Sequence, residues 1–346
     1  MKKVIAMGWL LLLGLACGVE EAPDPGDNGE TTPIANGEWT WVEVEGSTCG
    51  NGTPGGLGIY PGDDSRLVIF FAGGGACWDT VSCYVVGSAV NIEATFTQQR
   101  LEQEVRMVEN SGLLNRQDGP FGAATVAYVP YCTADLHTGD SVGSYDPLNP
   151  DRLIHHQGAV NVEAYLDYLS ASYPNAQEIF VVGVSAGGYG AMMNHHRISQ
   201  AFSGAPVHVL ADGAPMVQPR EGRWGAWKNA WEMQFPPGCQ ECEETFPKMA
   251  AHVVDSARGS RFALLTWEDD HTIAIYFAYP LDGLGPSVRG LIEEVYPDTP
   301  GGQAAAFRVT GTDHVALQYY DSLTDDDGVS LRDFVGAWAS GEALEQ

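Results

Sequence analysis

The sequence predicts an α/β fold in which a doubly wound, mostly parallel sheet carries helices on both faces. Two observations lead to this prediction. Short, almost continuously apolar runs recur along the chain, and stretches with apolar residues at helical spacing separate them. We expect strands at 67–71, 124–130, 178–184, 207–211, 262–267 and 307–310, and helices at 158–172, 187–202, 288–295 and 331–338.

The composition is that of a globular protein with an acidic surface. The chain has 346 residues, of which 44% are hydrophobic and 18% charged, so it is long enough to bury a full core. It carries 17 Lys and Arg against 45 Asp and Glu, a formal net charge of −28. A surface this acidic repels phosphate backbones, and we therefore expect no nucleic-acid partner.

The first residues read as an export signal. Lys2 and Lys3 precede an apolar run from residue 4 to residue 16, and Cys17 follows a small residue as in a bacterial lipobox. We expect a signal peptide over 1–16 with lipidation of Cys17, and ordinary signal-peptidase cleavage is the alternative. Residues 17–36 read as an acidic flexible tether, and 37–346 as the catalytic domain with an insertion near 218–246. The protein is then exported, either anchored in the bacterial cell envelope or extracellular.

The remaining cysteines predict disulfides. Six are left after Cys17, an even number that favours pairing in an exported chain. Short separations favour Cys77 with Cys83 and Cys239 with Cys242, which would leave Cys49 with Cys132. A zinc site at the single C-x-x-C is the rival interpretation, but no second pair of ligands stands near it. We expect no metal site.

The strand at 178–184 runs into a nucleophile motif. The order Gly183-Val184-Ser185-Ala186-Gly187 is G-x-S-x-G between a predicted strand and a predicted helix. Glycines are needed there because the turn is sharp and side chains on either side would collide. Ser185 is the predicted nucleophile.

A serine hydroxyl needs a base, and the base needs an acid that holds its tautomer. His314 follows the last predicted strand directly and is the predicted base, ahead of His252 and His271. For the acid we expect Asp269, at the end of the strand at 262–267. Asp270 and Asp212 remain as alternatives, and adjacent residues of an extended run point to opposite faces.

When a serine attacks a carbonyl carbon, the tetrahedral intermediate carries a negative oxygen. Backbone N–H groups must donate hydrogen bonds to this oxyanion. The strand at 67–71 leads into a loop with three consecutive glycines, and we expect the amides of Gly74, Gly75 and Ala186 to form this site. A phosphate-binding loop is disfavoured because neither G-K-[ST] nor G-x-G-x-x-G opens a helix here.

These motifs together resemble the pectin acetylesterase (Notum) family from Cys49 to His314. The resemblance rests on the turn Cys49-Gly50-Asn51-Gly52-Thr53-Pro54, the strand and Gly-rich loop at 70–77, Tyr131-Cys132 with Thr138-Gly139-Asp140, the elbow at 183–188 and the strand end at 210–212. It implies an α/β-hydrolase fold with a Ser185, Asp269 and His314 triad and an oxyanion hole of Gly74, Gly75 and Ala186.

We therefore expect a serine carboxylic-ester hydrolase that removes short acyl groups, most simply acetyl, from the hydroxyls of a glycan, with no cofactor. Loss of Lys2 and Lys3 would take the net charge from −28 to −30, which repels a polyanion such as pectin. A neutral acylated glycan or a small ester fits better. The alternatives are a general carboxylesterase or lipase-like hydrolase, and a non-catalytic binding protein. We expect a monomer that meets a membrane only through a lipid anchor at Cys17.

Overall fold

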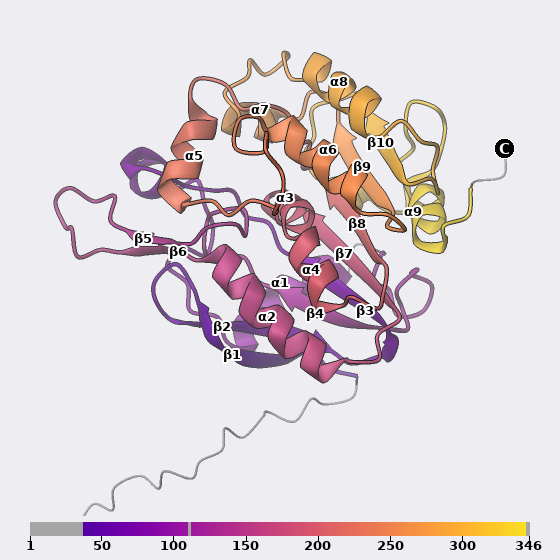
Figure 1. Ribbon diagram of the computed structural model, residues 1–346, viewed down its shortest axis with the longest axis horizontal. Coiled ribbons are helices and arrows are strands. Elements are labelled where there is room, and N and C mark those ends of the chain that lie inside the picture. Colours follow the sequence, from indigo (N-terminus) through magenta and orange to yellow (C-terminus); the bar gives the residue numbers. More distant parts are fainter. Residues whose placement is uncertain (1–36, 110–111, 344–346) are drawn as a thin grey trace, which may run out of the picture. The chain divides into compact units, whose positions relative to one another are not determined.

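The computed structural model describes residues 37–109 and 112–343, which belong to one compact unit (Figure 1). The expected signal peptide, lipidated Cys17 and tether lie outside the described residues. Within them, no helix is both long and apolar enough to cross a membrane.

A mixed, mostly parallel sheet forms the centre of this unit. Its strands are ordered β1-β2-β4-β3-β7-β8-β9-β10. The six strands from β4 to β10 in this order run parallel to their neighbours, whereas β1 and β2 join antiparallel at one edge. Their bounds are β1 Thr40–Thr48, β2 Pro54–Tyr60, β3 Asp63–Phe71, β4 Ala124–Val129, β7 Glu178–Val184, β8 Val207–Asp212, β9 Phe262–Trp267 and β10 Ala304–Val309.

Helices cover both faces of the sheet. In Figure 1, α2 (Gly158–Ser172), α3 (Ala186–Met193), α4 (His195–Ala201) and α6 (Phe246–Ser256) lie in front of it. The far face packs against α1 (Gln98–Glu109) and α9 (Leu331–Ser340): a Cβ on Gly58 would meet Leu101, and Phe180 packs edge-on against Trp338. The predicted fold class is confirmed.

Smaller elements lie between these layers. They are η1 (Val81–Val85), the hairpin strands β5 (Ser141–Gly143) and β6 (Ile154–His156), α5 (Arg223–Trp231), α7 (His271–Tyr276), α8 (Gly285–Val295) and η2 (Leu317–Tyr319).

One expectation about helices needs correction. The helix expected at 187–202 is two helices, α3 and α4, because Asn194 leaves the helical region at φ −94° and ψ 3°.

The segment 218–246, expected to be an insertion, contains α5. The three tryptophans of α5 are buried, with Trp227 stacked on Trp231, so they pack the interior and offer no exposed platform.

Three disulfides join loops of the described chain. Cys49 is bonded to Cys132 across 83 residues, Cys77 to Cys83 across 6, and Cys239 to Cys242 across 3. These are the two pairs that short separations favoured and the pair that they left over, and the C-x-x-C is a disulfide. No group of His, Cys, Asp and Glu in residues 37–109 and 112–343 is arranged to hold a metal ion.

We predict that the three disulfides stabilise the fold unequally. The Cys49–Cys132 bond closes by far the longest loop, 83 residues against 3 for Cys239–Cys242. On the loop-entropy argument, its removal costs about 4.5 kcal/mol and removal of the short one about 1.5 kcal/mol. Urea unfolding of the double Cys→Ala variants measures this. An equal or larger loss for the Cys239/Cys242 variant would contradict the prediction.

Candidate active site

Ser185 stands at a sharp turn between β7 and α3. Its backbone is held at φ 54° and ψ −123°, a region that residues with side chains rarely occupy. The turn is possible because Gly183 and Gly187 lack side chains: a Cβ on Gly183 would collide with the backbone of Gly187, and one on Gly187 with the backbone of Phe71. The nucleophile-elbow motif therefore folds as the sequence predicts.

His314 lies in the loop after β10 and reaches Ser185. Its Nε2 is 2.8 Å from the Ser185 Oγ, and its Nδ1 is 2.7 Å from the Asp270 Oδ2. The two contacts fit the neutral tautomer that carries its proton on Nδ1, with the serine hydroxyl donating to Nε2. His252 lies on α6 and His271 begins α7, so His314 is the candidate base that the fold brings to the serine.

The acid that contacts His314 is Asp270, and the choice of Asp269 was wrong. Asp270 is fully buried, and its Oδ1 accepts the Ile273 N–H, which caps α7 and fixes the carboxylate. The Asp269 Oδ1 instead accepts the Gly285 N–H at the start of α8. The sequence Asp270-His271-Thr272-Ile273 carries the signal that could have decided this, an N-cap residue before a short apolar helix.

Asp212, the third candidate acid, joins the loops of the site. Its carbonyl oxygen accepts the Ser185 N–H at 2.7 Å, and its carboxylate accepts the amides of Ala316 and Leu317 at 2.8 Å each. Burial raises the pKa of the Asp212 carboxyl to about 7, although the two amides and His314 favour the charged form. Asp212 therefore positions both the nucleophile and the histidine loop.

The Gly-rich loop after β3 lies beside Ser185. Gly74 and Gly75 line the same pocket as Ser185, and Ala186 is the first residue of α3. Within the described chain, no hydrogen bond engages the amides of these three residues, so they are available as donors. Gly75 has φ 78°, and a Cβ there would collide with the Ser88 carbonyl and the Tyr276 hydroxyl.

Buried side chains hold this loop from behind. The His137 Nε2 lies 2.9 Å from the Ala72 carbonyl oxygen, and the Tyr131 hydroxyl donates to the Gly75 carbonyl at 2.8 Å. Burial lowers the pKa of His137, so its neutral ring donates Nε2–H to Ala72. His137 itself is buried under the loop and does not line the pocket.

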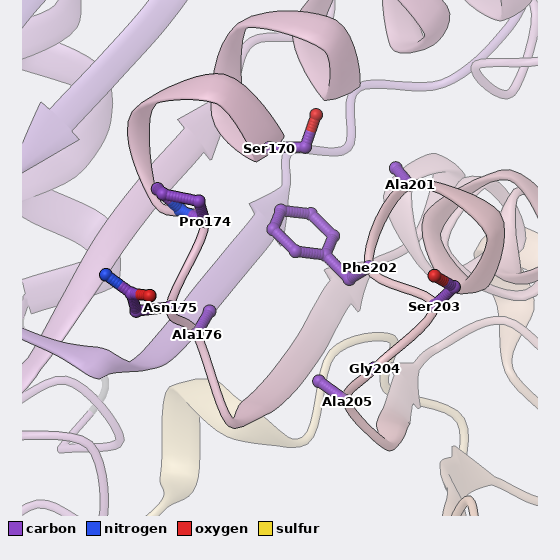
Figure 2. Close-up of a pocket in the computed structure, with 9 residues that line it drawn as sticks. All are labelled: Ser170, Pro174, Asn175, Ala176, Ala201, Phe202, Ser203, Gly204 and Ala205. Atoms are coloured by element: carbon purple, nitrogen blue, oxygen red, sulfur yellow. The ribbon is translucent and has the colours of Figure 1, made fainter.

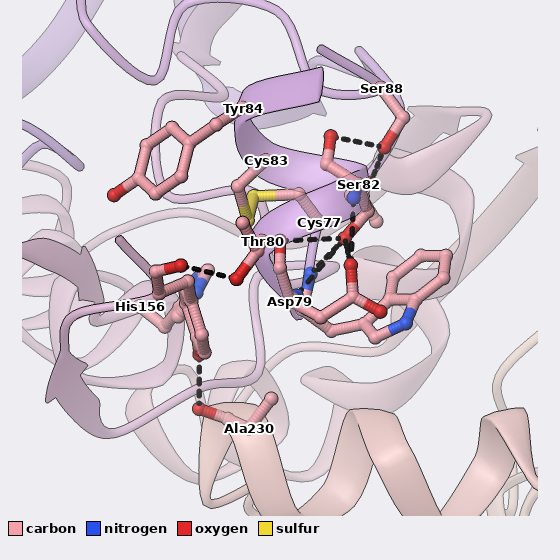
Figure 3. The surroundings of a disulfide bond; sticks show 12 residues. Cys77, Asp79, Thr80, Ser82, Cys83, Tyr84, Ser88, His156 and Ala230 are labelled. Carbon is pink, nitrogen blue, oxygen red and sulfur yellow. Dashed lines mark hydrogen bonds between the residues drawn. A yellow bond between two sulfur atoms is a disulfide. The ribbon is translucent and has the colours of Figure 1, made fainter. Parts of the chain in front are cut away.

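The segment after the loop is fixed by a disulfide and a hydrogen-bond network. Figure 3 shows Cys77–Cys83 beside Asp79, whose carboxylate accepts from the Ser82 N–H and hydroxyl at 2.7 and 2.8 Å. Ser88 in turn donates from its hydroxyl to the Ser82 carbonyl, and its own carbonyl accepts from Tyr276 of α7. This network fixes one wall of the pocket.

A pocket of about 600 Å³ opens at Ser185 and His314. Its lining is mostly apolar and includes side chains from the sheet, α1 and the loop around η2, among them Phe70, Tyr128, Val90, Val108, Val315 and Leu317. A second cavity of about 480 Å³, shown in Figure 2, lies where the loops enter β7 and β8, at the opposite edge of the sheet from Ser185. None of its nine lining residues titrates.

Residues 37–221 match the pectinacetylesterase family, which is more than half of the chain. The chain belongs to the pectinacetylesterase family. The match contains Ser185, the Gly-rich loop and Asp212, whereas Asp270 and His314 lie beyond it.

This pectinacetylesterase family member is similar to two curated relatives. It is 26% identical over 169 residues to palmitoleoyl-protein carboxylesterase notum1a of Danio rerio, and 26% identical over 157 residues to palmitoleoyl-protein carboxylesterase notum2 of Xenopus laevis. The alignments cover 46% and 44% of this chain but only 31% and 30% of the relatives. The chain thus spans about a third of their length.

Solved structures share the fold. The Wnt deacylase Notum from Drosophila matches in two crystal forms, with TM-scores of 0.66 and 0.63 and 18% identity. Each match covers 89% of this chain and 95% or 96% of the Notum chain. This likeness shows an α/β-hydrolase-like fold for the family member.

We predict that Asp212 makes folding stability depend on pH. Its pKa rises from the usual 3.8 to about 7 on folding, so between these values the folded protein holds a proton that the unfolded chain releases. Stability contributed by Asp212 is therefore present at low pH and lost as the pH rises toward 7.

The measurement is urea unfolding of the wild type and of Asp212→Asn between pH 4.5 and 8. Both proteins keep Asp270 and His314, the titratable groups nearest Asp212. The stability of the wild type relative to the variant should fall by up to about 1.4 kcal/mol per pH unit below pH 7 and then level off. A difference that stays constant over this range would refute the raised pKa.

Proposed function

We propose that this protein is a serine carboxylic-ester hydrolase that works through an acyl-enzyme. The observation that carries the proposal is the hydrogen-bonded chain from Ser185 through His314 to Asp270, with distances of 2.8 and 2.7 Å, at the mouth of an apolar pocket. An exposed or isolated serine would have no means of losing its proton. The curated relatives are named as carboxylesterases, which supports the same chemistry.

The first step transfers a proton and forms a bond. The His314 Nε2 takes the Ser185 hydroxyl proton while the Oγ attacks the ester carbonyl carbon. The imidazolium that forms donates from Nδ1 to the Asp270 carboxylate, which holds the ring in place. Since Asp270 is fully buried and also accepts the Ile273 N–H, it keeps one orientation through the reaction.

The second step releases the alcohol and then the acid. Negative charge develops on the former carbonyl oxygen, and the free amides of Gly74, Gly75 and Ala186 are the donors available for it. His314 gives its proton to the leaving alcohol, and the acyl group stays on Ser185. Water that His314 deprotonates then releases the acid and restores the serine.

The pocket favours acyl groups larger than acetyl. It holds about 600 Å³ and is lined mostly by apolar side chains, far more space than a two-carbon acyl group fills. Burial of each methylene contributes about 0.8 kcal/mol, so a longer apolar acyl chain binds better there. Acetyl removal from a neutral glycan remains the second candidate, supported by the family's description as pectinacetylesterases.

We predict Ser185-dependent hydrolysis of p-nitrophenyl esters, with a higher kcat/KM for hexanoate and octanoate than for acetate. Ser185→Ala should lower kcat at least a thousandfold on every ester, because no other group in the pocket replaces the nucleophile. Release of p-nitrophenol is followed by absorbance. Equal rates from wild type and Ser185→Ala would end the esterase proposal, and a preference for acetate would favour the second candidate.

We predict that the two neighbouring aspartates differ sharply in their effect on catalysis. Asp270→Asn should lower kcat by roughly 10⁴ because His314 would adopt the wrong tautomer. Asp269→Asn is the matched control and should change kcat less than tenfold, since Asp269 contacts the start of α8. Steady-state kinetics on one p-nitrophenyl ester decides this, and the reverse order of effects would restore Asp269 as the acid.

We also propose that the chain is exported, because its three disulfides persist in oxidising compartments. The anchor at Cys17 is part of this proposal. Mass spectrometry of the N-terminal peptide from the bacterial envelope should find Cys17 as the first residue, with a diacylglyceryl group. A free N-terminus beyond Cys17 would show secretion without an anchor.

A further inference from the structure

The part of the catalytic pocket that lies under α1 contains a carboxylate. From Ser185 the pocket extends along the sheet face that α1 covers, between Phe70 and Tyr128 on the strands and Glu104 and Val108 on the helix. Glu104 and Val108 are four residues apart and share one face of α1. The Glu104 side chain is only 14% exposed and lines the pocket beside apolar side chains.

The Glu104 carboxylate retains capacity to accept a hydrogen bond. Its Oε1 forms an ion pair with Arg100 at 2.7 Å and accepts a hydrogen bond from Asn91 at 3.3 Å, and its Oε2 accepts from the Tyr128 hydroxyl at 3.2 Å. A carboxylate oxygen has two acceptor positions, so Oε2 can take one more donor. Burial raises the pKa of Tyr128 well above its usual range, so its phenol stays protonated and donates to Glu104.

From this arrangement we propose that the pocket selects acyl groups with an apolar body and a hydroxyl at the far end. The apolar body packs against Phe70 and Val108, and the terminal hydroxyl donates to the Glu104 carboxylate. Glu104 is then a specificity-determining residue. The inference rests on the proposed esterase function, because it assigns the acyl side of that same site.

The selection follows from the cost of leaving a largely buried acceptor atom without its hydrogen bond. An acyl group with a fully apolar end would strip water from the Oε2 of Glu104 without replacing the lost hydrogen bond. A terminal hydroxyl replaces that water with a charge-assisted bond. A site built around a buried acceptor therefore discriminates against the analogue that lacks the donor.

Paired aromatic esters test this. Methyl phenylacetate, 3-phenylpropanoate and 4-phenylbutanoate are compared with their 4-hydroxyphenyl counterparts, and acid release is followed in a pH-stat. For at least one chain length, we expect the hydroxylated ester to have a kcat/KM about tenfold or more higher. Glu104→Leu, which keeps the size but has no acceptor, should bring this ratio to about 1.

Two further variants separate specificity from folding. Glu104→Gln keeps the shape and removes the charge, and should give an intermediate ratio. Glu102→Gln removes a carboxylate from the exposed side of α1 and should keep the wild-type ratio. Each variant is measured on both esters of a pair. Partial unfolding lowers both rates by the same factor, so the ratio of the two kcat/KM values is unaffected.

The outcomes distinguish this proposal from the esterase proposal. Ser185-dependent hydrolysis with equal rates on both members of every pair would overturn the role of Glu104 and leave the esterase intact. The same holds if the preference survives in Glu104→Leu, or if only p-nitrophenyl esters are cleaved. Failure to cleave any ester, or cleavage that survives in Ser185→Ala, would overturn both.

Discussion

The hydrogen bonds of Asp212 are the contacts on which the rest of the site depends. Its backbone carbonyl fixes the turn that carries Ser185, and its carboxylate fixes the loop that carries His314. The serine and the histidine are 129 residues apart in the chain, yet their reacting atoms must meet within hydrogen-bond distance. One buried residue at the end of β8 sets both positions, the serine through its backbone carbonyl and the histidine loop through its carboxylate.

The remaining parts of the site follow from the parallel sheet. The carboxyl ends of β3, β7, β8, β9 and β10 meet at one edge, and each contributes a loop to the site. Reacting groups gather at that edge, whereas the acyl pocket extends along the sheet face under α1. Because His137 and Tyr131 hold the Gly-rich loop from beneath, its amides stay free for a substrate.

The sequence was most informative where local pattern and tertiary structure agree. The strand ending at Val184 and helix α2 have the predicted bounds, because a continuously buried strand and a long helix leave clear patterns. The two antiparallel strands β1 and β2 escaped prediction because they mix polar residues and glycines. Asp270 was ranked behind Asp269 because alternation along an extended strand was applied beyond its end, where the chain already turns into α7.

For helices α1 and α5, the sequence pattern did not predict which side chains face the pocket or the interior. Helix α1 has a largely polar sequence, and its contribution to the pocket comes from two residues on one face that only the packed fold places there. The tryptophans of α5 form a regular stripe, but the sequence does not say whether such a stripe faces solvent or the interior. Burial in both cases is decided by neighbours distant in the chain.

The strained backbone of Ser185 limits how the protein can be stabilised. At φ 54° and ψ −123° the residue that would relax the turn is glycine, which has no hydroxyl. A substitution that would raise the thermal stability at position 185 would thus remove the nucleophile. A thermostable variant that keeps the nucleophile must therefore gain its stability from substitutions outside this turn.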